Sequence, residues 1–339
     1  MKTKLFPDNS QSLIKKYLSE TLYNTLKERK TSSGFTIDQA IKSGISNPDS
    51  DIGIYAGDAE TYDTFSEIFD LIIADYHSYK PDNWHVTNFS IPSLPILDSE
   101  NKYIVSTRIR VARNLYGFPF TTFISAKERQ QVEQLILQAT INLPKNLQGQ
   151  YYHLKDIIGL NSESLNNSFF PKKGDRFQEA AGITRDFPDS RGVFIADNQK
   201  FMIWINEEDH LRIISMESGS DIIGIFTRLA NAIQILEQNL KFSFSEQYGH
   251  LTACPSNLGI SMRASVHIQL PKLNKQKELL YKTAEQYKLQ IRGTSGEKSN
   301  VENSIFDISN KQRLGISEKD CLLILSKGIK KLIELEEQV

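Results

Sequence analysis

At 339 residues the chain is long enough for one large domain or two unequal ones, and its 18 Phe, 13 Tyr and 2 Trp supply ample apolar surface for a core. The 40 basic and 41 acidic residues nearly cancel, which argues against a general nucleic-acid-binding protein with a basic excess. The two cysteines are far apart in sequence and the six histidines lack metal-ligand spacing, so we expect neither a disulfide nor a zinc site. The sequence has no apolar run long enough for a membrane span and no N-terminal signal pattern, which predicts a cytoplasmic protein.

The first eighty residues are predicted to be helical around one loop. Apolar residues recur at helical spacing over 12–29, which predicts a single amphipathic helix there. Thr36 followed by Gln39 has the pattern of a capping box and predicts the start of a second helix. Turn-forming residues fill 46–60 and indicate a loop, and apolar spacing over 65–76 predicts a further helix.

A proline-containing stretch separates this helical segment from the rest of the chain. Residues 80–98 hold three prolines and no hydrophobic period, which is typical of a linker. Beyond it, 102–111 has the pattern of a strand, and Ser125 with Glu128 forms a second capping box. We expect a helical N-terminal domain over 1–82, a linker over 83–97 and a larger domain over 98–339.

The larger domain is predicted to mix strands and helices. Three strand-like runs crowd together at 192–196, 201–205 and 212–216. Asp197 and Asn198 suit a turn between the first two, so an antiparallel meander is expected. A helix over 221–239, a strand over 264–270 and a final helix capped by Ser317 follow. This order favours an α+β fold over a doubly wound parallel sheet.

Five arginines lie at strand ends or strand–loop junctions: Arg108, Arg110, Arg212, Arg263 and Arg292. Arg108 and Arg110 are two apart in a predicted strand, so both point to one face. Two like charges there are costly unless an anion lies between them. Because a guanidinium binds phosphate oxygens in bidentate fashion, five that converge would suit a di- or triphosphate. Five unrelated surface arginines are the alternative.

The common nucleotide-binding motifs do not accompany these arginines. The chain has no GxxxxGK[ST] motif and none of the Gly-rich loop, HRD and DFG motifs of protein kinases. If the protein binds ATP, guanidinium groups must therefore replace the usual backbone cradle.

Two glutamates are candidates to bind a cation. Glu208 lies in the acidic run 206–210 beside strands rich in Ile and Trp, and Glu297 lies in a Gly-flanked loop after Arg292. Two glutamates that grip one planar guanidinium would fix its orientation, and such alignment can be worth roughly 7–11 kcal/mol. A solvent-exposed acidic turn is the simpler explanation of the run.

Cys254 opens a stiff turn with Pro255 and Ser256. The Ser256 hydroxyl can donate to a thiolate, which would lower the pKa of the cysteine. Arg263 follows at the mouth of the predicted strand. For a lone cysteine the commoner explanation is a small buried core residue, and for Arg263 a solvated surface charge.

Long motifs in this sequence resemble those of the phosphagen (guanidino) kinase family, and most closely its arginine kinase branch. The matching stretches are STRIRVARNLYGFPF (106–120), GDRF (174–177), WINEEDHLRIISM (204–216), CPSNLGISMRASVHIQLPKL (254–273), RGTSGE (292–297) and DISNKQRLG (307–315). The resemblance implies a small all-helical N-terminal domain and a larger domain with an antiparallel β-sheet flanked by helices. It also implies energy buffering by reversible transfer of the γ-phosphoryl of MgATP to a guanidine, foremost L-arginine. The nucleotide, rather than the protein, would hold Mg²⁺.

The resemblance implies roles for individual residues, matched motif by motif. Those implied in nucleotide binding are Ser106, Thr107, Arg108, Ile109, Arg110, Arg212, Arg263, Ala264, Ser265, Val266, His267, Arg292, Gly293, Thr294, Ser295, Gly296 and Glu297. Those implied in substrate binding are Ser50, Asp51, Ile52, Gly53, Ile54, Tyr55, Glu208, Cys254 and Glu297. Glu208, Glu297 and Cys254 are the implied catalytic residues, with the glutamates clamping the guanidinium and Cys254 lying against it as a thiolate. The loop 48–58 would fold over the α-carboxylate and α-amino end of the substrate, and Asp49 with Arg176 would latch the closed domains.

The sequence departs from the family pattern at a few places. Asp51 stands where arginine kinases usually have Gly, and an anion close to the substrate carboxylate should weaken binding unless its side chain points away. Ile52 replaces a valine. Ser168 and Lys298 replace two histidines that usually flank the adenosine, and Ser295 replaces an arginine.

Other functions stay open at this point. A kinase for another guanidine, such as taurocyamine, is a close alternative, and a weakly active nucleotide-binding scaffold is the alternative of another class. Bacterial protein-arginine kinases share some of the motifs but lack the helical N-terminal domain. The expected partners are ATP or ADP and a small guanidine, without nucleic acid or membrane, in a monomer or a dimer.

Overall fold

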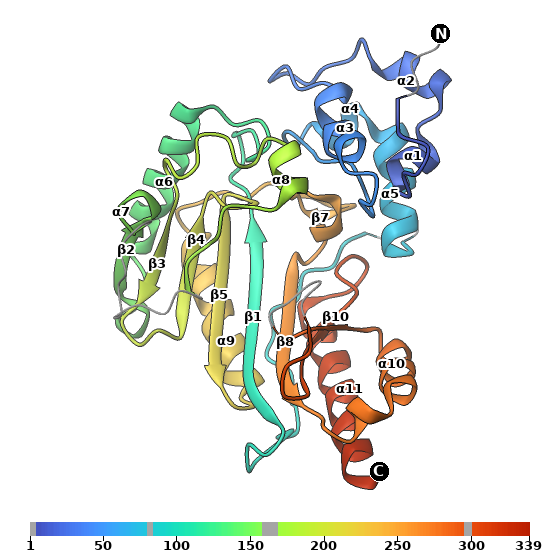
Figure 1. Ribbon diagram of the computed structural model, residues 1–339. Helices are drawn as coiled ribbons and strands as arrows, with labels where there is room; N and C mark the ends of the chain where they lie inside the picture. The colour runs from blue at the N-terminus through green and yellow to red at the C-terminus, as the bar shows by residue number, and fades with distance from the viewer. Residues whose placement is uncertain (1–4, 80–83, 158–168, 295–299) are drawn as a thin grey trace.

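The computed structural model describes residues 5–79, 84–157, 169–294 and 300–339 (Figure 1). A small helical domain at the N-terminus stands on a larger domain built around one sheet, which confirms the predicted α+β fold class. None of the helices in these ranges combines the length and apolarity that a membrane span requires. The domain boundaries at 82 and 98 stay predictions.

The N-terminal domain contains α1 (Leu13–Tyr17), α2 (Glu20–Leu26), α3 (Ile37–Ser46), α4 (Thr61–Thr64) and α5 (Ser66–His77). The prediction of one helix over 12–29 is wrong, because the chain leaves helical geometry at Leu18 and Ser19. Ser19 is extended, and its hydroxyl accepts a hydrogen bond from the Leu22 amide at 3.1 Å. This contact satisfies a donor at the start of α2 and so stabilises a new helix there.

The predicted capping box at Thr36 is confirmed. The Gln39 side chain accepts from the Thr36 amide at 2.9 Å, and the Thr36 hydroxyl accepts from the Gln39 amide at 3.4 Å. Within α3, the Gly44 amide donates to the Gly53 carbonyl at 3.0 Å, and a Cβ on Gly44 would lie 2.4 Å from that oxygen. Gly44 is therefore where the loop 46–60 crosses the helix closely.

The larger domain is organised by an eight-stranded sheet in the order β2-β3-β4-β5-β1-β8-β10-β9, in which each pair of neighbours is antiparallel. The strands are β1 (Ile104–Arg113), β2 (Gly149–His153), β3 (Gly192–Ala196), β4 (Phe201–Ile205), β5 (Leu211–Ser218), β8 (Met262–Gln269), β9 (Leu289–Arg292) and β10 (Ile305–Asn310). The predicted meander is confirmed as β3-β4-β5. The prediction omitted β2 and β10.

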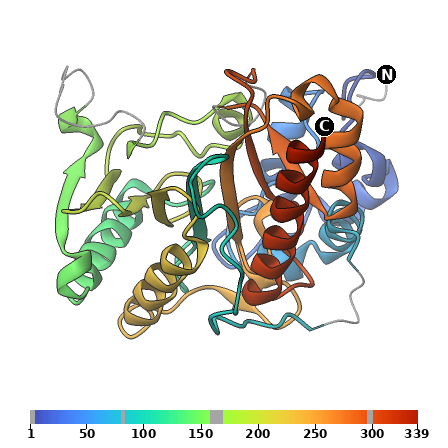
Figure 2. The same ribbon diagram turned by 90° about the horizontal axis from the view of Figure 1, so that it is seen from below.

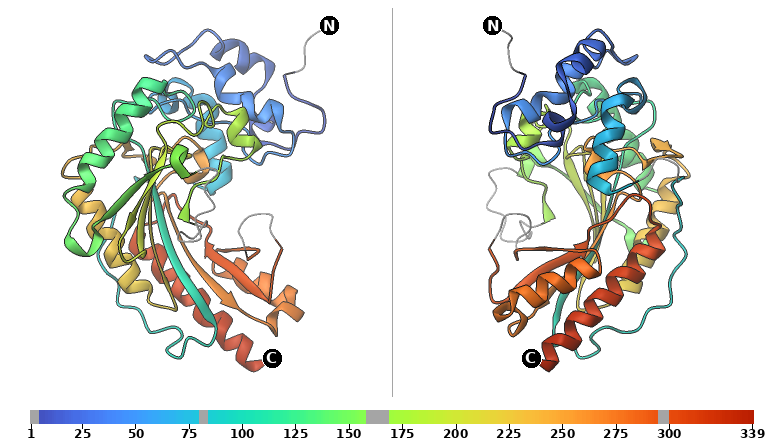
Figure 3. Two further views of the ribbon diagram at one scale, coloured as in Figure 1. Left: turned by 60° about the vertical axis from the view of Figure 1, so that its left-hand side comes forward. Right: turned by 90° about the vertical axis from the view of Figure 1, so that its right-hand side faces the viewer.

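Helices cover one face of this sheet (Figures 2 and 3). They are α6 (Ala126–Thr140), α9 (Ile222–Leu236) and α11 (Glu318–Gln338), with α10 (Lys277–Gln286) beside β9. Residues of α6, α9 and α11 share one hydrophobic core with the strands. The capping box of Ser125 and Glu128 begins α6 as predicted. The apolar spacing of this helix also predicts that Leu135 faces the core, which is wrong, because its side chain is 40% exposed.

The two domains meet around the segment 251–257, which follows the short β7 (Gly249–His250) and contains the turn η3 (Pro255–Asn257). The Ala56 amide donates to the Ala253 carbonyl at 2.8 Å, and the Tyr62 hydroxyl donates to the Thr252 carbonyl at 2.7 Å. Apolar residues of both domains form a second core there. Backbone hydrogen bonds and packing therefore hold the segment with Cys254 against the N-terminal domain.

Candidate active site

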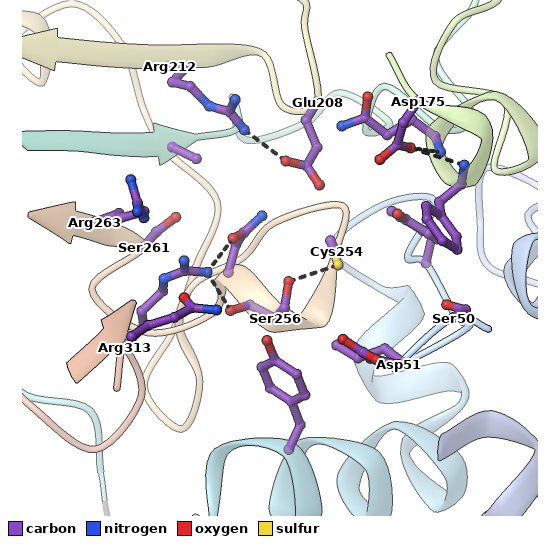
Figure 4. Close-up of a pocket in the computed structure, with 18 of the residues that line it drawn as sticks. Ser50, Asp51, Asp175, Glu208, Arg212, Cys254, Ser256, Ser261, Arg263 and Arg313 are labelled. Carbon is purple, nitrogen blue, oxygen red and sulfur yellow. Dashed lines mark hydrogen bonds and ion pairs between the residues drawn. The ribbon is translucent and has the colours of Figure 1, made fainter. Parts of the chain in front are cut away.

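A pocket of about 360 Å³ opens where the open face of the sheet meets the N-terminal domain (Figure 4). Its walls come from the ends of β1, β5, β8 and β9, from the loop 49–55, from α8 (Arg176–Ala180) and from η3. The predicted site residues in its lining are Asp49, Ser50, Asp51, Ile52, Gly53, Tyr55, Arg110, Glu208, Arg212, Cys254, Arg263 and Arg292. Residues far apart in the sequence thus share one cavity.

Strand pairing brings the predicted arginines together. Arg110 of β1 lies directly opposite Arg263 of β8, and Arg212 lies on β5, the other neighbour of β1. Arg292 ends β9 and lines the same pocket. Arg108 is not in the lining, but it interacts electrostatically with Arg212 and Arg292. Four of the five predicted arginines therefore converge on the cavity, and the fifth lies two residues from Arg110 along β1.

These cations repel one another in a poorly solvated place. Burial lowers the pKa of Arg110 well below its usual value, and the neighbouring Arg212, Arg108 and Arg263 lower it further. Arg263 is 3% exposed and pairs with Asp307 at 2.8 Å, yet burial still lowers the pKa of Arg263 to about 10. Because like charges are packed together away from water, a bound polyanion would relieve their repulsion.

Glu208 lies beside the arginines and forms an ion pair with Arg212. The Arg212 Nη2 donates to Glu208 Oε2 at 2.7 Å, and its Nη1 lies 2.9 Å from Glu207 Oε2. Burial raises the pKa of Glu208, with Arg212 opposing the shift and Glu207 adding to it. A carboxylate with a raised pKa accepts a proton more readily, which suits a general base.

Asp209, the next residue, is buried and connects this turn to the cysteine segment. Its Oδ1 accepts from the Asn114 side chain at 2.6 Å and from the Ala253 amide at 2.8 Å. Its Oδ2 is buried and has no hydrogen-bond partner in the described part of the chain. Burial first, and Glu208 second, raise the pKa of Asp209 to about 7. The acidic run is therefore a buried part of the site, not a solvent-exposed turn.

Cys254 is buried on the pocket wall, and its Sγ lies 3.0 Å from the Ser256 hydroxyl, as the sequence suggests. Burial, and then the charge of Glu208, raise the pKa of Cys254 to about 12, whereas hydrogen bonds from Ser256 lower it. These surroundings thus favour the thiol over the thiolate. A cation bound between Cys254 and Glu208 would shift this balance toward the thiolate, whose role stays a prediction.

The loop 50–55 presents backbone donors. The carbonyls of Asp51, Ile52 and Gly53 accept from the amides of Leu13, Ile14 and Gly44 at 2.9, 3.0 and 3.0 Å. In a trans peptide the N–H points opposite to the carbonyl, so the amides that follow these carbonyls point away from the anchoring helices. Within the described ranges, the amides of 52–54 have no acceptor, and Ile52 and Gly53 line the pocket. This part of the wall can bind an anion such as a carboxylate.

Asp49 and Arg176 form an ion pair between the N-terminal domain and α8. A second bond, from Arg176 Nη1 to Asn47 Oδ1 at 3.0 Å, joins the same segments, and the guanidinium lies 4.4 Å from the ring centre of Phe177. Both charged side chains are about half exposed, at 54% and 53%. The predicted latch residues are in contact, and their role in closure stays a prediction.

The other predicted nucleotide-binding residues lie along β1, β8 and the end of β9. The Ser106 hydroxyl is 3.1 Å from His267 Nδ1, and the Thr294 hydroxyl donates to the Ile305 carbonyl at 2.7 Å. The side chains that are buried away from the pocket lining are those of Ile54, Thr107, Ile109, Ala264, Ser265 and Val266. Gly293 follows β9 and is also buried. Ser168, Ser295, Gly296, Glu297 and Lys298 lie outside the described residues.

Several lining residues escaped prediction, and Arg313 is the most informative. Its Nη1 donates to the Ser256 carbonyl at 2.9 Å and to Asn257 Oδ1 at 2.6 Å, so it holds η3 and thereby Cys254 in place (Figure 4). The others are Tyr76, Val111, Ala112, Asp175, Phe177, Gln178, Asn257, Ser261 and Gln290. Arg313 follows β10 in an irregular segment, where strand patterns give no signal.

The described residues contain no group of three or more His, Cys, Asp or Glu that could hold a metal ion. The chemistry of the pocket's donors agrees with this, since its cationic half would repel a bare divalent cation.

Two family models match the chain. The model "ATP:guanido phosphotransferase, N-terminal domain" matches residues 8–74, and "ATP:guanido phosphotransferase, C-terminal catalytic domain" matches residues 131–339. Similar proteins include an arginine kinase of Penaeus monodon, 42% identical over 97% of this chain and 94% of that protein. An arginine kinase of Limulus polyphemus is 41% identical over 96% of this chain and 93% of that protein.

Solved structures with the same fold include two kinases for other guanidines. A lombricine kinase superimposes with a TM-score of 0.90 at 34% identity, over 98% of this chain and 94% of that one. A duplicated taurocyamine kinase from Schistosoma mansoni, with bound transition state analog components, gives a TM-score of 0.90 at 36% identity. That alignment covers 97% of this chain and 46% of the duplicated one.

Proposed function

This chain belongs to the ATP:guanido phosphotransferase family and is a phosphagen (guanidino) kinase, and we propose that it transfers the γ-phosphoryl of MgATP reversibly to L-arginine. The observation that carries this proposal is the composition of one pocket. Four arginines line its sheet side, while Glu208, Cys254 and residues of the amide-bearing loop 50–55 are among those that line the other walls. A polyphosphate and a guanidinium with an anionic tail would each find complementary groups there.

On the sheet side, Arg110, Arg212, Arg263 and Arg292 would bind the phosphates, together with the neighbouring Arg108 of β1. Phosphoryl transfer proceeds through a loose transition state, so positioning and neutralisation of charge do most of the work. The described residues supply no metal cage, so Mg²⁺ would be held by nucleotide oxygens and water and would neutralise phosphate charge. The protein's part is to fix the γ-phosphoryl in line with the acceptor nitrogen.

On the other side, Glu208 and Cys254 would orient the guanidinium, with Glu297 as the second carboxylate of the predicted clamp. When a guanidinium occupies this place, Arg212 can exchange Glu208 for a phosphate oxygen, while Glu207 remains at 2.9 Å. The guanidine nitrogen then attacks the γ-phosphorus, the bond from phosphorus to the β,γ-bridging oxygen breaks, and ADP leaves. The proton lost from nitrogen would pass to Glu208, whose pKa is raised by burial.

Closure of the two domains would protect the reaction from water. The Asp49–Arg176 pair joins the substrate loop's domain to α8 of the larger domain. Holding the domains together around both substrates would exclude water and so limit ATP hydrolysis. We place the pair in this latch role.

Arginine is favoured over other guanidines by two lines of support. The full-length relatives described above are arginine kinases at 41–42% identity. The amides at Ile52 and Gly53, which have no acceptor among the described residues, suit the α-carboxylate of an amino acid. Taurocyamine is the second candidate, because a kinase for it has the same fold and a sulfonate could also accept from these amides. A weakly active nucleotide-binding scaffold is disfavoured by the buried groups at Glu208 and Cys254.

The test is a coupled assay of ADP release with L-arginine, creatine, taurocyamine and lombricine side by side, each with MgATP. We expect the largest kcat/KM for L-arginine, and the reverse reaction with phosphoarginine and MgADP to produce ATP. A larger kcat/KM for another guanidine would reassign the substrate, and no turnover with any of the four would refute the proposed reaction.

A further inference from the structure

One side of the pocket carries arginines and the other carries aspartates. This difference in charge affects the part of the substrate opposite its guanidinium, which we call its tail. Figure 4 shows Arg212, Arg263 and Arg313 on one side of Cys254, and Ser50, Asp51 and Asp175 on the other. All of these residues belong to the lining. A ligand that extends from the cationic half past Cys254 therefore reaches a wall that carries carboxylates.

Two of the carboxylates on that wall already have partners. Asp49 is paired with Arg176. Asp175 caps α8, with its Oδ1 accepting from the amides of Phe177 and Gln178 at 3.0 Å each. Both charges are thus compensated by the protein itself.

Asp51 differs from these two. Its side chain is exposed to the pocket and forms no ion pair or hydrogen bond within the residues that the structure describes. Its backbone is fixed, because its carbonyl accepts from the Leu13 amide at 2.9 Å and the next carbonyl accepts from Ile14 at 3.0 Å. The Asp51 carboxylate is therefore a positioned and uncompensated negative charge at the tail end of the site.

The same short stretch offers both an anion and anion-binding donors. The available amides of Ile52 and Gly53 directly follow the Asp51 carboxylate in the chain. A tail with only a negative group would be attracted by the amides and repelled by Asp51. A zwitterionic tail, with an ammonium and a carboxylate on one carbon, would satisfy both sets of groups at once.

We propose that Asp51 binds the α-ammonium of the substrate and so makes the enzyme selective for guanidines that carry this group. The inference rests on the proposed function and adds the substrate class. Guanidines that carry an ammonium, as free amino acids or as amines, are accepted, while guanidino acids without an amine are rejected. It reverses the effect on arginine affinity that the sequence predicts, in which Asp51 repels the substrate carboxylate and weakens binding unless its side chain points away. The ammonium lies on the same carbon, so the loop amides can take the carboxylate while Asp51 takes the cation.

The test compares three ligands that share one guanidinium and one chain length. L-Arginine has both tail charges, agmatine keeps only the ammonium, and δ-guanidinovalerate keeps only the carboxylate. Their KM and kcat are measured for the wild type, Asp51→Asn and Asp51→Gly. Asp197→Asn, at the exposed turn between β3 and β4, is a control that removes one charge outside the pocket.

Asp51→Asn is expected to raise the KM for L-arginine and for agmatine by roughly three- to tenfold, as expected for loss of a partly exposed charge pair, with kcat little changed. The same change is expected to lower the KM for δ-guanidinovalerate. A lower KM for L-arginine in Asp51→Asn, or a parallel shift in KM for all three ligands, would overturn the inference.

Calorimetric binding of the three ligands with MgADP present gives the same comparison independently of turnover. Thus a wild type that phosphorylates none of them refutes the function, while the binding series still decides the role of Asp51.

Discussion

Arg212 and Glu208 form an ion pair inside the pocket, with Nη2 and Oε2 2.7 Å apart. The cation belongs to the proposed phosphate side and the anion to the proposed guanidinium side, so this ion pair joins the two halves of the pocket. It is also largely buried, at 11% and 14% side-chain exposure. Binding of both substrates would replace it with two intermolecular contacts, which couples the two binding steps.

The first prediction concerns Glu208. Glu208→Gln keeps the shape but removes the negative charge that would orient the guanidinium and accept its proton. We expect kcat to fall by roughly 100-fold or more, since loss of a general base typically costs 10²–10⁴ in rate. Thermal unfolding should change far less than turnover, because the glutamine amide oxygen can still accept from Arg212.

Glu207→Gln is the matched control, since Glu207 also contacts Arg212 at 2.9 Å but does not line the pocket. It should lose less than about tenfold in kcat. Equal losses in the two variants would show that the charge on Arg212, and not contact with substrate, explains the effect. Glu297→Gln is expected to resemble Glu208→Gln, as the second half of the clamp.

The second prediction concerns the pKa of Cys254. Glu208 raises this pKa and Ser256 lowers it, so their removal should shift it in opposite directions. We expect the pKa to be lowest in Glu208→Gln, intermediate in the wild type and highest in Ser256→Ala. The measurement is the pH dependence of the rate of iodoacetamide alkylation in the absence of substrates, in a Cys321→Ser background.

A Glu208→Gln variant whose alkylation profile coincides with that of the wild type would contradict this account of the thiol. Cys254→Ala is expected to fold normally and to turn over slowly. If it turns over at the wild-type rate, the thiol serves only in packing.

The parts of the fold that could be predicted from sequence depend on local signals. Capping boxes at Thr36 and Ser125 use residues three apart, so they mark helix starts without knowledge of the tertiary structure. The break at Leu18 could not be predicted, because the apolar spacing of 12–29 continues through it. β10 lies between β8 and β9 in the sheet, and this pairing forms only in the folded chain.

The site divides in the same way. The convergence of the arginines followed from the family resemblance, because their positions in the predicted strands are equally compatible with five unrelated surface arginines. The roles of Asp209 and Arg313 could not be predicted, since each acts on the cysteine segment through contacts formed only in the folded chain, to Ala253 and to Ser256. The hydrogen bonds from the α8 amides to Asp175 could not be predicted either. They distinguish Asp175 from Asp51, which forms no ion pair or hydrogen bond among the residues that the structure describes.

The third prediction concerns Arg313 as a positioning residue. Arg313→Lys can restore one of its two hydrogen bonds to η3, whereas Arg313→Ala restores neither. We expect kcat to fall progressively from wild type to Lys to Ala, and alkylation of Cys254 to become faster as the segment loosens. A purely structural role would lower thermal stability without this ordered change in thiol reactivity. Unchanged alkylation in both variants would exclude the positioning role.

The fourth prediction concerns the latch between Asp49 and Arg176. Exposed ion pairs add little to stability, so neither Asp49→Arg nor Arg176→Asp should shift the unfolding temperature appreciably. Each single change should lower kcat/KM, because two like charges would then oppose closure. The double variant should recover part of the loss, and the wild-type activity should fall with added salt. Failure of the double variant to recover would show that the pair has no latch function.

The fifth prediction concerns the pH dependence of stability through Asp209. Burial and Glu208 raise the pKa of Asp209 from 3.8 to about 7, so between these values the folded state binds more protons than the unfolded state. Stability from this group should therefore be fully present below about pH 4 and be lost as pH rises toward 7, by at most about 1.4 kcal/mol per pH unit.

Asp209→Asn keeps an oxygen for Asn114 and Ala253 and removes the titration of this carboxyl group. Chemical unfolding of both proteins at pH 5 and pH 8 should show a smaller loss of stability in the variant over this interval, and at pH 8 the variant should equal or exceed the wild type. A variant that is less stable at pH 8 while showing the same pH dependence would mean that Asp209 stays ionised and paired throughout, contrary to the burial and the unpartnered oxygen that the structure shows.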